Sequence, residues 1–388
     1  MSQAEQQYEV LTAVAASELA SKYLSGHSYS AREFGDGNLN LVFRVTADSG
    51  RSLIIKQALP YLRAAGEAWP LTIERARIEV DALREMAALI PGSVPLIFGF
   101  DDFRAAMVME DLSPGTTWRS ELISGNATGT LPEDIAGFVA ALIQRTASML
   151  HDESTVTSWR ERFPYSPLCS VTEQLVFSDP FTQAASNVVL PELAQQVAMM
   201  QQDPNVQAAA HSALETFRTS KECLLHGDLH TGSVMSTPWG TRLIDLEFSF
   251  YGPIGFDTGL LMANLALARI SNGVRGDHAH AARIDSYAHR YWHRLQADLA
   301  PIRASHGADV HLALLSRLQG QAQEFMAVEM IRRVVSLARA QDIETLARGL
   351  AAEASAQALE GGLAILLASR ETGLPEAWRL ATTGGRVV

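Results

Sequence analysis

The chain has 388 residues, of which 47% are hydrophobic and 19% charged, with a formal net charge of −12 and a pI near 5.4. This length suits two domains with a large core, and the composition excludes extended disorder. The acidic balance disfavours nucleic acid and anionic membranes, so we expect neither as a partner.

The N-terminal part begins with a helical pattern at residues 8–26 and continues into a glycine-containing turn. Gly35 and Gly37 are separated by one residue, and the alternation of apolar residues over 39–45 predicts a strand. In kinases, the backbone N–H groups of a glycine loop between two strands contact the nucleotide phosphates. A plain hairpin turn is the alternative reading of this pattern.

A second strand is predicted at residues 52–57 and carries Lys56, one of three lysines in the chain. A kinase needs a cation at this place to bind the α- and β-phosphates, and a carboxylate from the next helix to hold that cation. The alternative is a lysine on an edge strand that extends into water.

A helix is predicted from Thr72, its expected cap, to about Leu89, after an irregular insert at residues 60–71. Of the two glutamates on this helix, Glu74 and Glu79, we favour Glu79 as the partner of Lys56. A solvated charged face shared with neighbouring arginines is the alternative.

Strands at residues 94–100 and 105–109 complete a small N-terminal lobe of five strands and one helix. The chain then reaches a natural boundary, so we place the domains at 1–111 and 112–388. Backbone groups at this hinge could hydrogen-bond an adenine edge, and the residues concerned are Met109, Glu110, Asp111 and Leu112.

The second domain is predicted to be mostly helical. Its expected helices cover residues 132–151, 170–177, 189–201, 205–220, 256–270, 276–298, 308–338 and 342–370.

Residues 223–257 interrupt these helices and carry the candidate catalytic groups. A short apolar run leads to Asp228 in a turn, and a second one leads to Asp245 and Glu247. We expect the last two on one side of an extended strand, because strand side chains alternate between faces. Phosphoryl transfer requires a carboxylate near the attacking hydroxyl and oxygen ligands for Mg²⁺. A turn-capping aspartate and a solvated strand face are the alternatives.

The chain lacks signs of export or of a membrane span. Its two cysteines, Cys169 and Cys223, have no metal spacing, and its first residues do not form a secretory signal. The most apolar late stretch, 354–367, is too short for a bilayer. We therefore expect a cytoplasmic protein.

Six segments carry a family resemblance: GDGNLNLVFRV, GEAWPLTIERARIE, VMEDLS, LLHGDLHTGS, LIDLEFSFYGPIGFDTG and MIRRVV. Together they resemble the protein-kinase-like small-molecule kinases, the superfamily of aminoglycoside phosphotransferases and choline kinases. More closely, they resemble the methylthioribose kinase family. The segments span about residues 34–337, and the combination of HGDLHTGS with the segment after it is more specific than HGDLH alone.

The resemblance implies an α+β, two-lobed protein-kinase-like fold, with a small antiparallel N-terminal lobe and a helical C-terminal lobe. It implies transfer of the ATP γ-phosphoryl group to the 1-hydroxyl of 5-methylthioribose, with Asp228 as the catalytic carboxylate. Asp245 and Glu247 would carry Mg²⁺. Nucleotide binding is assigned to the glycine loop, to Lys56 with Glu79, and to the hinge; the loop residues are Gly35, Asp36, Gly37, Asn38 and Asn40.

Four further residues receive roles from the resemblance. His226 and Asp257 would fix the shape of the catalytic loop, and Arg332 and Arg333 would bind the sugar. Because Glu329 precedes the arginines on the same predicted helix, surface ion pairs are the alternative, although the apolar neighbours favour burial.

The pattern departs from the superfamily at two places. Ser233 stands where aminoglycoside and choline kinases have a metal-binding Asn, so we expect Glu247 to supply that ligand. Asn40 ends the glycine loop in place of a third glycine, so the sequence does not determine the geometry that this loop adopts when it closes.

The expected partner is a small-molecule sugar, and the expected assembly is a homodimer because family members commonly form one. A kinase of an aminoglycoside, choline or homoserine is the first rival interpretation. A nucleotide-binding pseudokinase scaffold is the second.

Overall fold

The computed structural model describes residues 9–34, 39–62, 66–126, 129–368 and 372–384. The chain divides into two compact units, and each is described by itself. Unit 1 comprises Met1–Gly115 and Arg242–Ser249, and unit 2 comprises Thr116–Thr241 and Phe250–Val388. The boundary expected after residue 111 thus lies near the first crossing between units, but residues 242–249 return to unit 1.

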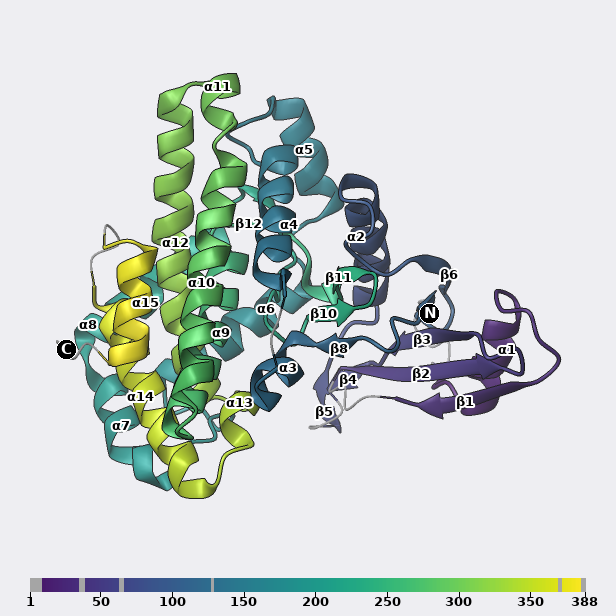
Figure 1. Cartoon of the computed structure of the whole chain (residues 1–388), viewed down its shortest axis with the longest axis horizontal. Helices are drawn as coiled ribbons and strands as arrows, with labels where there is room; N and C mark the ends of the chain where they lie inside the picture. Colours follow the sequence, from purple (N-terminus) through teal and green to yellow (C-terminus); the bar gives the residue numbers. More distant parts are fainter. Residues whose placement is uncertain (1–8, 35–38, 63–65, 127–128, 369–371, 385–388) are drawn as a thin grey trace, which may run out of the picture. The chain divides into compact units, whose positions relative to one another are not determined.

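Unit 1 is built on an antiparallel sheet in the order β1-β2-β3-β7-β6 (Figure 1). Lys56 lies on β3, the central strand, so the edge-strand alternative is wrong. The strands are β1 (Tyr29–Glu33), β2 (Asn40–Ala47), β3 (Ser52–Ala58), β6 (Ile97–Asp101) and β7 (Ala106–Glu110).

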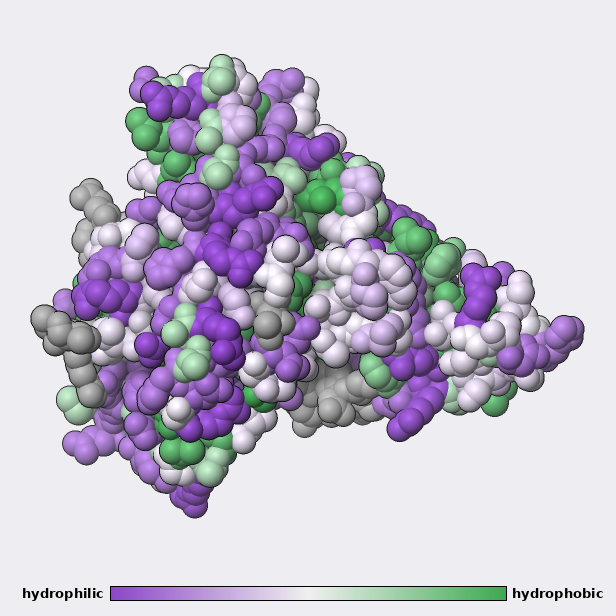
Figure 2. Space-filling model, in the orientation of Figure 1, coloured by the Kyte–Doolittle hydropathy of each residue, from purple (hydrophilic) through white to green (hydrophobic). Residues whose placement is uncertain are grey.

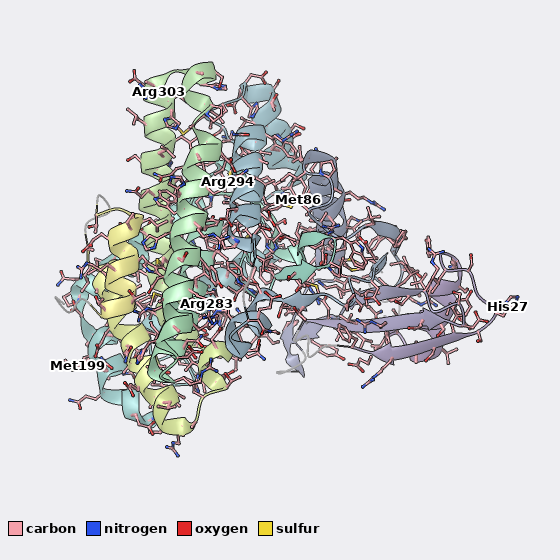
Figure 3. All side chains as sticks on the ribbon, in the orientation of Figure 1. His27, Met86, Met199, Arg283, Arg294 and Arg303 are labelled. Atoms are coloured by element: carbon pink, nitrogen blue, oxygen red, sulfur yellow. The ribbon has the colours of Figure 1, made fainter. Side chains whose placement is uncertain are left out.

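The two faces of this sheet receive different side chains because strand residues alternate. Leu53 and Ile55 of β3 belong to the core that also contains apolar residues of α1 (Ala13–Ser21). Lys56 therefore points to the opposite face, where it meets a carboxylate of α2 (Arg75–Leu89). Met86 of α2 is fully buried (Figure 3).

Three details of unit 1 differ from the sequence prediction. The helix after residue 72 begins at Arg75, with Glu74 at its N-cap position, so Thr72 is not its cap. The insert contains a two-stranded hairpin of β4 (Tyr61–Leu62) and β5 (Gly66–Pro70) and is not irregular throughout. The helical pattern at residues 8–26 corresponds to α1, which packs beside β1 and β2, so the described part of the unit has two α-helices where the predicted lobe counted one.

Unit 2 is mostly helical, as expected, and its long helices α9, α10, α12 and α14 pack together with α4 (Figure 1). The sequence prediction missed α3, α5, α11 and α15, and it joined α13 to α14. The helices are α3 (Trp118–Ser124), α4 (Leu131–Thr146), α5 (Glu153–Arg162), α6 (Pro167–Thr172), α7 (Ala194–Gln202), α8 (Pro204–Thr219), α9 (Phe256–Val274), α10 (His278–Leu299), α11 (Ile302–His306), α12 (Ala308–Val335), α13 (Gln341–Glu344), α14 (Arg348–Leu366) and α15 (Leu374–Thr383).

Short irregular elements complete the two units. A π-helical turn, η2 (Glu173–Ser178), follows α6 directly, and 3-10 turns occur at η3 (Asp179–Phe181), η4 (Pro191–Leu193) and η5 (Leu246–Phe248). The remaining strands are β8 (Thr116–Thr117), β9 (Cys223–Leu224), β10 (Val234–Thr237), β11 (Gly240–Leu243) and β12 (Tyr251–Gly252).

The described helices include none that is both long and apolar enough to cross a membrane. On the face of the molecule in Figure 2, hydrophobic residues form small groups separated by hydrophilic ones.

Candidate active site

Lys56 is the centre of a buried charge cluster in unit 1. Its Nζ lies 2.7 Å from Glu79 Oε1 and 2.7 Å from Asp245 Oδ1. Burial opposes the charge of Lys56, but the carboxylates of Asp245, Glu79 and Glu247 outweigh it and raise the pKa of the ammonium group. The expected pairing with Glu79 is thus present, and these carboxylates favour the charged form of Lys56.

Glu247 is held by Arg75, which the sequence analysis considered only as one of the arginines of a possible charged helix face. Arg75 is fully buried, and its Nε donates to Glu247 Oε2 at 2.8 Å. Asn40 Nδ2 donates to Glu247 Oε1, also at 2.8 Å. Arg75 Nη1 additionally binds the carbonyl oxygens of Leu59 and Thr72. Arg75 Nη2 also donates to Asn40 Oδ1 at 3.3 Å, so one guanidinium group connects β2, the end of β3, the start of α2 and Glu247.

The prediction of an extended strand for Asp245 and Glu247 is wrong. Strand β11 ends at Leu243, Asp245 has left-handed backbone angles (φ 63°, ψ 53°), and Glu247 lies in the 3-10 turn η5. Aspartate is among the few residues that tolerate this conformation. The turn exposes half of the Asp245 side chain and buries that of Glu247, because the left-handed residue breaks the alternation.

The donor set around these two carboxylates fits a hard cation. Each oxygen of Glu247 accepts one hydrogen bond, and a carboxylate oxygen has about two acceptor positions. Carboxylate oxygens are the ligands that Mg²⁺ prefers, and Mg²⁺ commonly uses one or two of them together with substrate phosphates. No cluster of three or more His, Cys, Asp or Glu residues that could enclose a metal occurs in the described ranges.

The other residues predicted to bind the nucleotide belong to the glycine loop and to the hinge. Gly35, Asp36, Gly37 and Asn38 lie outside the described residues. At the hinge, Met109 and Glu110 belong to β7, and the carboxylate of Asp111 accepts from Ser52 Oγ at 2.6 Å and pairs with Arg44 Nε at 2.9 Å. The Asp111 side chain therefore fixes the end of the sheet, while Leu112 is buried.

In unit 2, Asp257 fixes the loop that carries Asp228. Its two oxygens accept the backbone N–H groups of His226 at 2.7 Å and Gly227 at 3.0 Å. His226 Nδ1 accepts the N–H of Asp228 at 3.3 Å. The loop contacts expected of Asp257 and His226 are present, and the Asp228 side chain remains partly exposed, at 29%.

Ser233 has a structural role in this loop. Its side chain is buried and its hydroxyl lies 3.0 Å from the carbonyl oxygen of Asp228 and 2.9 Å from the backbone N–H of His230, which donates to it. The hydroxyl is therefore used to close the loop.

His230 is oriented toward Asp228. Its Nδ1 accepts the backbone N–H groups of Gly232 and Ser233, both at 3.0 Å. Burial and the guanidinium groups of Arg119 and Arg333 lower the pKa of His230 well below its ordinary value, so the ring is neutral. Its proton is thus on Nε2, which lies 3.5 Å from Asp228 Oδ2.

Arg332 and Arg333 are buried, so the surface-pair alternative is wrong. Glu329 has no exposed surface and accepts Arg332 Nε at 2.7 Å and Arg333 Nε at 2.6 Å. Burial opposes the charge of Glu329, but the two arginines outweigh it and lower the pKa of the carboxyl. Both arginines lie near enough to Asp228 for its charge to act on them.

Two further residues of this cluster were missed by the sequence analysis. Arg119 on α3 lies with its Nε 3.4 Å from Asp342 Oδ2, and its Nη2 donates to Asn264 Oδ1 at 2.8 Å. Asp342 on α13 is 2% exposed. No periodic pattern marks either residue, because their proximity depends on packing between elements more than 200 positions apart.

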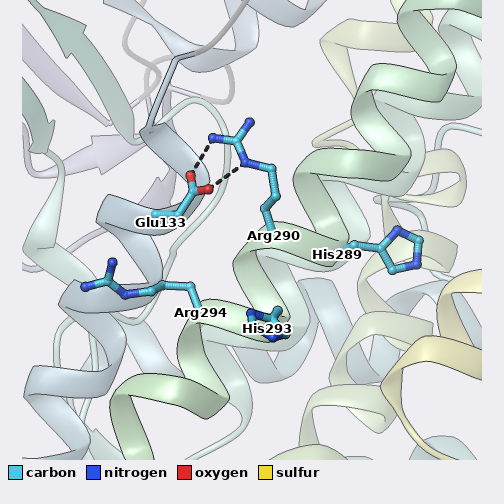
Figure 4. A pocket seen from close by; sticks show the side chains of 5 residues that line it. All are labelled: Glu133, His289, Arg290, His293 and Arg294. Carbon is cyan, nitrogen blue, oxygen red and sulfur yellow. Dashed lines mark hydrogen bonds and ion pairs between the residues drawn. The ribbon is translucent and has the colours of Figure 1, made fainter.

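A pocket elsewhere in unit 2 does not contain the predicted site. It has a volume of about 380 Å³ and is lined by Glu133 of α4 and by His289, Arg290, His293 and Arg294 of α10 (Figure 4). Glu133 and Arg290 form two hydrogen bonds of 2.6 Å, and His289 projects away from them. The carboxylate of Glu133 and the guanidinium group of Arg290 thus neutralise each other.

Comparisons with known proteins show the family to which the chain belongs. Residues 30–304 match the model of the phosphotransferase enzyme family. The methylthioribose kinase of Geobacillus kaustophilus is 36% identical over 348 residues, 87% of this chain and 87% of that protein. That of Bacillus pumilus is 36% identical over 351 residues, with the same two coverages. An aminoglycoside phosphotransferase structure from Alicyclobacillus acidocaldarius aligns with 94% of this chain and 96% of its own, at 15% identity and a TM-score of 0.46.

Proposed function

The chain belongs to the phosphotransferase enzyme family and to the methylthioribose kinases within it, and from this premise we propose that it phosphorylates 5-methylthioribose at the 1-hydroxyl, with ATP as donor. The product would be 5-methylthioribose 1-phosphate, an intermediate of methionine salvage. The observation that carries the proposal is the 36% identity to methylthioribose kinases over 87% of the chain.

Unit 1 offers the groups that a nucleotide needs. Lys56, fixed between two carboxylates, would bind the phosphates, and Asp245 and Glu247 would hold Mg²⁺. When bound, Mg²⁺ neutralises the charge that develops on the phosphoryl group. The buried pairing of Glu247 with Arg75 keeps one ligand in place before nucleotide arrives.

Unit 2 offers the groups that the sugar needs. Asp228 would accept the proton of the 1-hydroxyl as the bond from that oxygen to the γ-phosphorus forms and the bond from phosphorus to the ADP oxygen breaks. His230 would orient the carboxylate through Nε2–H. Because the transition state is loose, positioning and charge neutralisation contribute more than covalent chemistry.

A coupled assay of ADP release tests the proposal. We expect turnover with 5-methylthioribose well above that with ribose, because the thioether distinguishes the two, and little turnover with choline or an aminoglycoside. Buried cationic arginines would repel cationic substrates. Preferred turnover of an amine would reject the methylthioribose assignment, and ATP binding without turnover on any substrate would indicate a pseudokinase.

Replacing Arg332 with alanine is expected to raise the KM for methylthioribose and to lower kcat, with little effect on ATP binding. The guanidinium group is a fixed multidentate donor suited to sugar hydroxyls and developing charge. The loss should be about 10- to 100-fold in kcat/KM, the usual range for a charged hydrogen bond. Steady-state kinetics with each substrate varied in turn measure it, with exposed Arg303 changed to alanine as the control. An unchanged sugar profile would contradict the role.

The expected location and assembly belong to the same proposal. Cys169 and Cys223 are both buried free thiols, which supports a reducing, cytoplasmic setting. The homodimer is expected from the family and can be tested by analytical ultracentrifugation.

A further inference from the structure

The proposed substrate sets a hydrogen-bonding requirement that arginine alone cannot meet. Methylthioribose has two hydroxyl groups, at carbons 2 and 3, besides the one that reacts. Each hydroxyl has one proton to donate and two acceptor positions. Arg119, Arg332 and Arg333 offer only donors, so the protons of the two remaining hydroxyls need acceptors.

The described carboxylates of the arginine cluster differ in the acceptor capacity that they have left. Asp228 is assigned to the reacting hydroxyl. Glu329 has little capacity left, since about three of its four acceptor positions are taken by Arg332, Arg333 and Asn264 Nδ2. The third carboxylate, Asp342, accepts no hydrogen bond at either oxygen from any other described residue.

The burial of the Asp342 carboxylate without hydrogen bonds is unfavourable unless a ligand supplies a donor. The residue is 2% exposed, and a buried polar group without hydrogen bonds is destabilising, the more so when it is charged. Arg119 is its ion-pair partner at 3.4 Å, which balances charge without supplying a hydrogen bond of ordinary length. Burial raises the pKa of the Asp342 carboxyl, with Arg119 opposing the shift.

We propose that Asp342 is a specificity residue that accepts the proton of the 2- or 3-hydroxyl of the sugar, while Arg119 beside it donates to the hydroxyl oxygen. The proposal rests on methylthioribose as the substrate and assigns the recognition of its diol. Asp342 and Arg119 come from α13 and α3, two short helices that contact each other. The site would thus favour a sugar that retains the hydroxyl group bound by Asp342.

The test combines Asp342→Asn with substrate analogues that lack one hydroxyl. Wild type, Asp342→Asn and the matched control Glu344→Gln, an exposed carboxylate on the same helix, are assayed with methylthioribose and with its 2-deoxy and 3-deoxy analogues. We expect Asp342→Asn to lower kcat/KM for methylthioribose about 10- to 100-fold. With the analogue that lacks the recognised hydroxyl, the same substitution should change kcat/KM less than about 3-fold, because the lost bond is already absent.

Two measurements separate recognition from a structural role. If Asp342 only balances Arg119 within the fold, Asp342→Asn lowers kcat/KM equally for all three sugars, and that result would overturn the inference. Calorimetric titration of methylthioribose gives a second readout, with weaker binding expected for Asp342→Asn and wild-type affinity for Glu344→Gln. If wild type turns over methylthioribose and the ratio of kcat/KM between methylthioribose and each deoxy analogue is the same in Asp342→Asn as in wild type, the inference alone fails. If wild type does not phosphorylate methylthioribose, the proposed function fails and the inference with it.

Discussion

Replacing Asp228 with asparagine is expected to lower kcat by about 100- to 10,000-fold, the range for loss of a positioned general base. The amide keeps the shape of the side chain but cannot accept the proton of the sugar hydroxyl. The loop should remain folded, because its contacts with Asp257 and Ser233 use the backbone of the loop. Single-turnover kinetics with methylthioribose and ATP measure the loss directly.

Binding measurements decide whether the lower kcat of Asp228→Asn comes from the phosphoryl-transfer step and not from weaker ATP binding. ATP affinity of Asp228→Asn, measured by calorimetry, should remain within about 3-fold of wild type, since Lys56 and the carboxylates of unit 1 are unchanged. Asp309→Asn, an exposed acid-to-amide change at the start of α12, is the matched control and should keep wild-type turnover. Near-wild-type turnover of Asp228→Asn would contradict the catalytic assignment.

The positions of Lys56 and Glu79 could be predicted from the sequence, because the periodicity of a strand or helix determines which way a side chain faces. Lys56 follows Ile55 on an alternating strand, so one of the two had to face away from the α1 core. Glu79 lies on the buried stripe of α2, which made it a better partner for Lys56 than Glu74. Both inferences need only strand and helix geometry.

Arg75 could have been predicted from the same geometry. It lies four residues before Glu79 and is followed at helical spacing by Ala82 and Met86, and all four are buried. An arginine on an inward stripe must have an anionic partner, although the sequence does not say which. That partner, Glu247, is 172 positions away.

The remaining differences arise from features without a periodic signal. The left-handed backbone of Asp245 is a property of one residue and has no sequence pattern. Because of it the chain forms a 3-10 turn where a strand was predicted. The environment of Asp342 depends on how α13 packs against α3, and a four-residue helix has too little sequence to predict its neighbours.

Replacing Arg75 with methionine is expected to lower the free energy of unfolding by about 3–5 kcal/mol, the cost of removing one partner of a buried ion pair. Methionine retains much of the side-chain volume, but Glu247 is left buried without its cation, and the carbonyl oxygens of Leu59 and Thr72 lose their donor. Denaturant unfolding, followed by the midpoint and slope, measures the loss. Arg77→Met, an exposed arginine on the same helix, is the control and should change stability by less than about 1 kcal/mol.

A double variant distinguishes the ion pair from the volume of the side chain. Arg75→Met combined with Glu247→Gln removes the uncompensated charge, so it should be more stable than Arg75→Met alone, while the unpaired carbonyl oxygens keep it below wild type. Its affinity for Mg²⁺–ATP should nevertheless stay low, because Glu247 is the proposed ligand. If the double variant were no more stable than Arg75→Met, the buried charge would not be the source of the loss. Wild-type Mg²⁺–ATP affinity in the double variant would remove Glu247 from the metal site, since stability and binding report on its two roles separately.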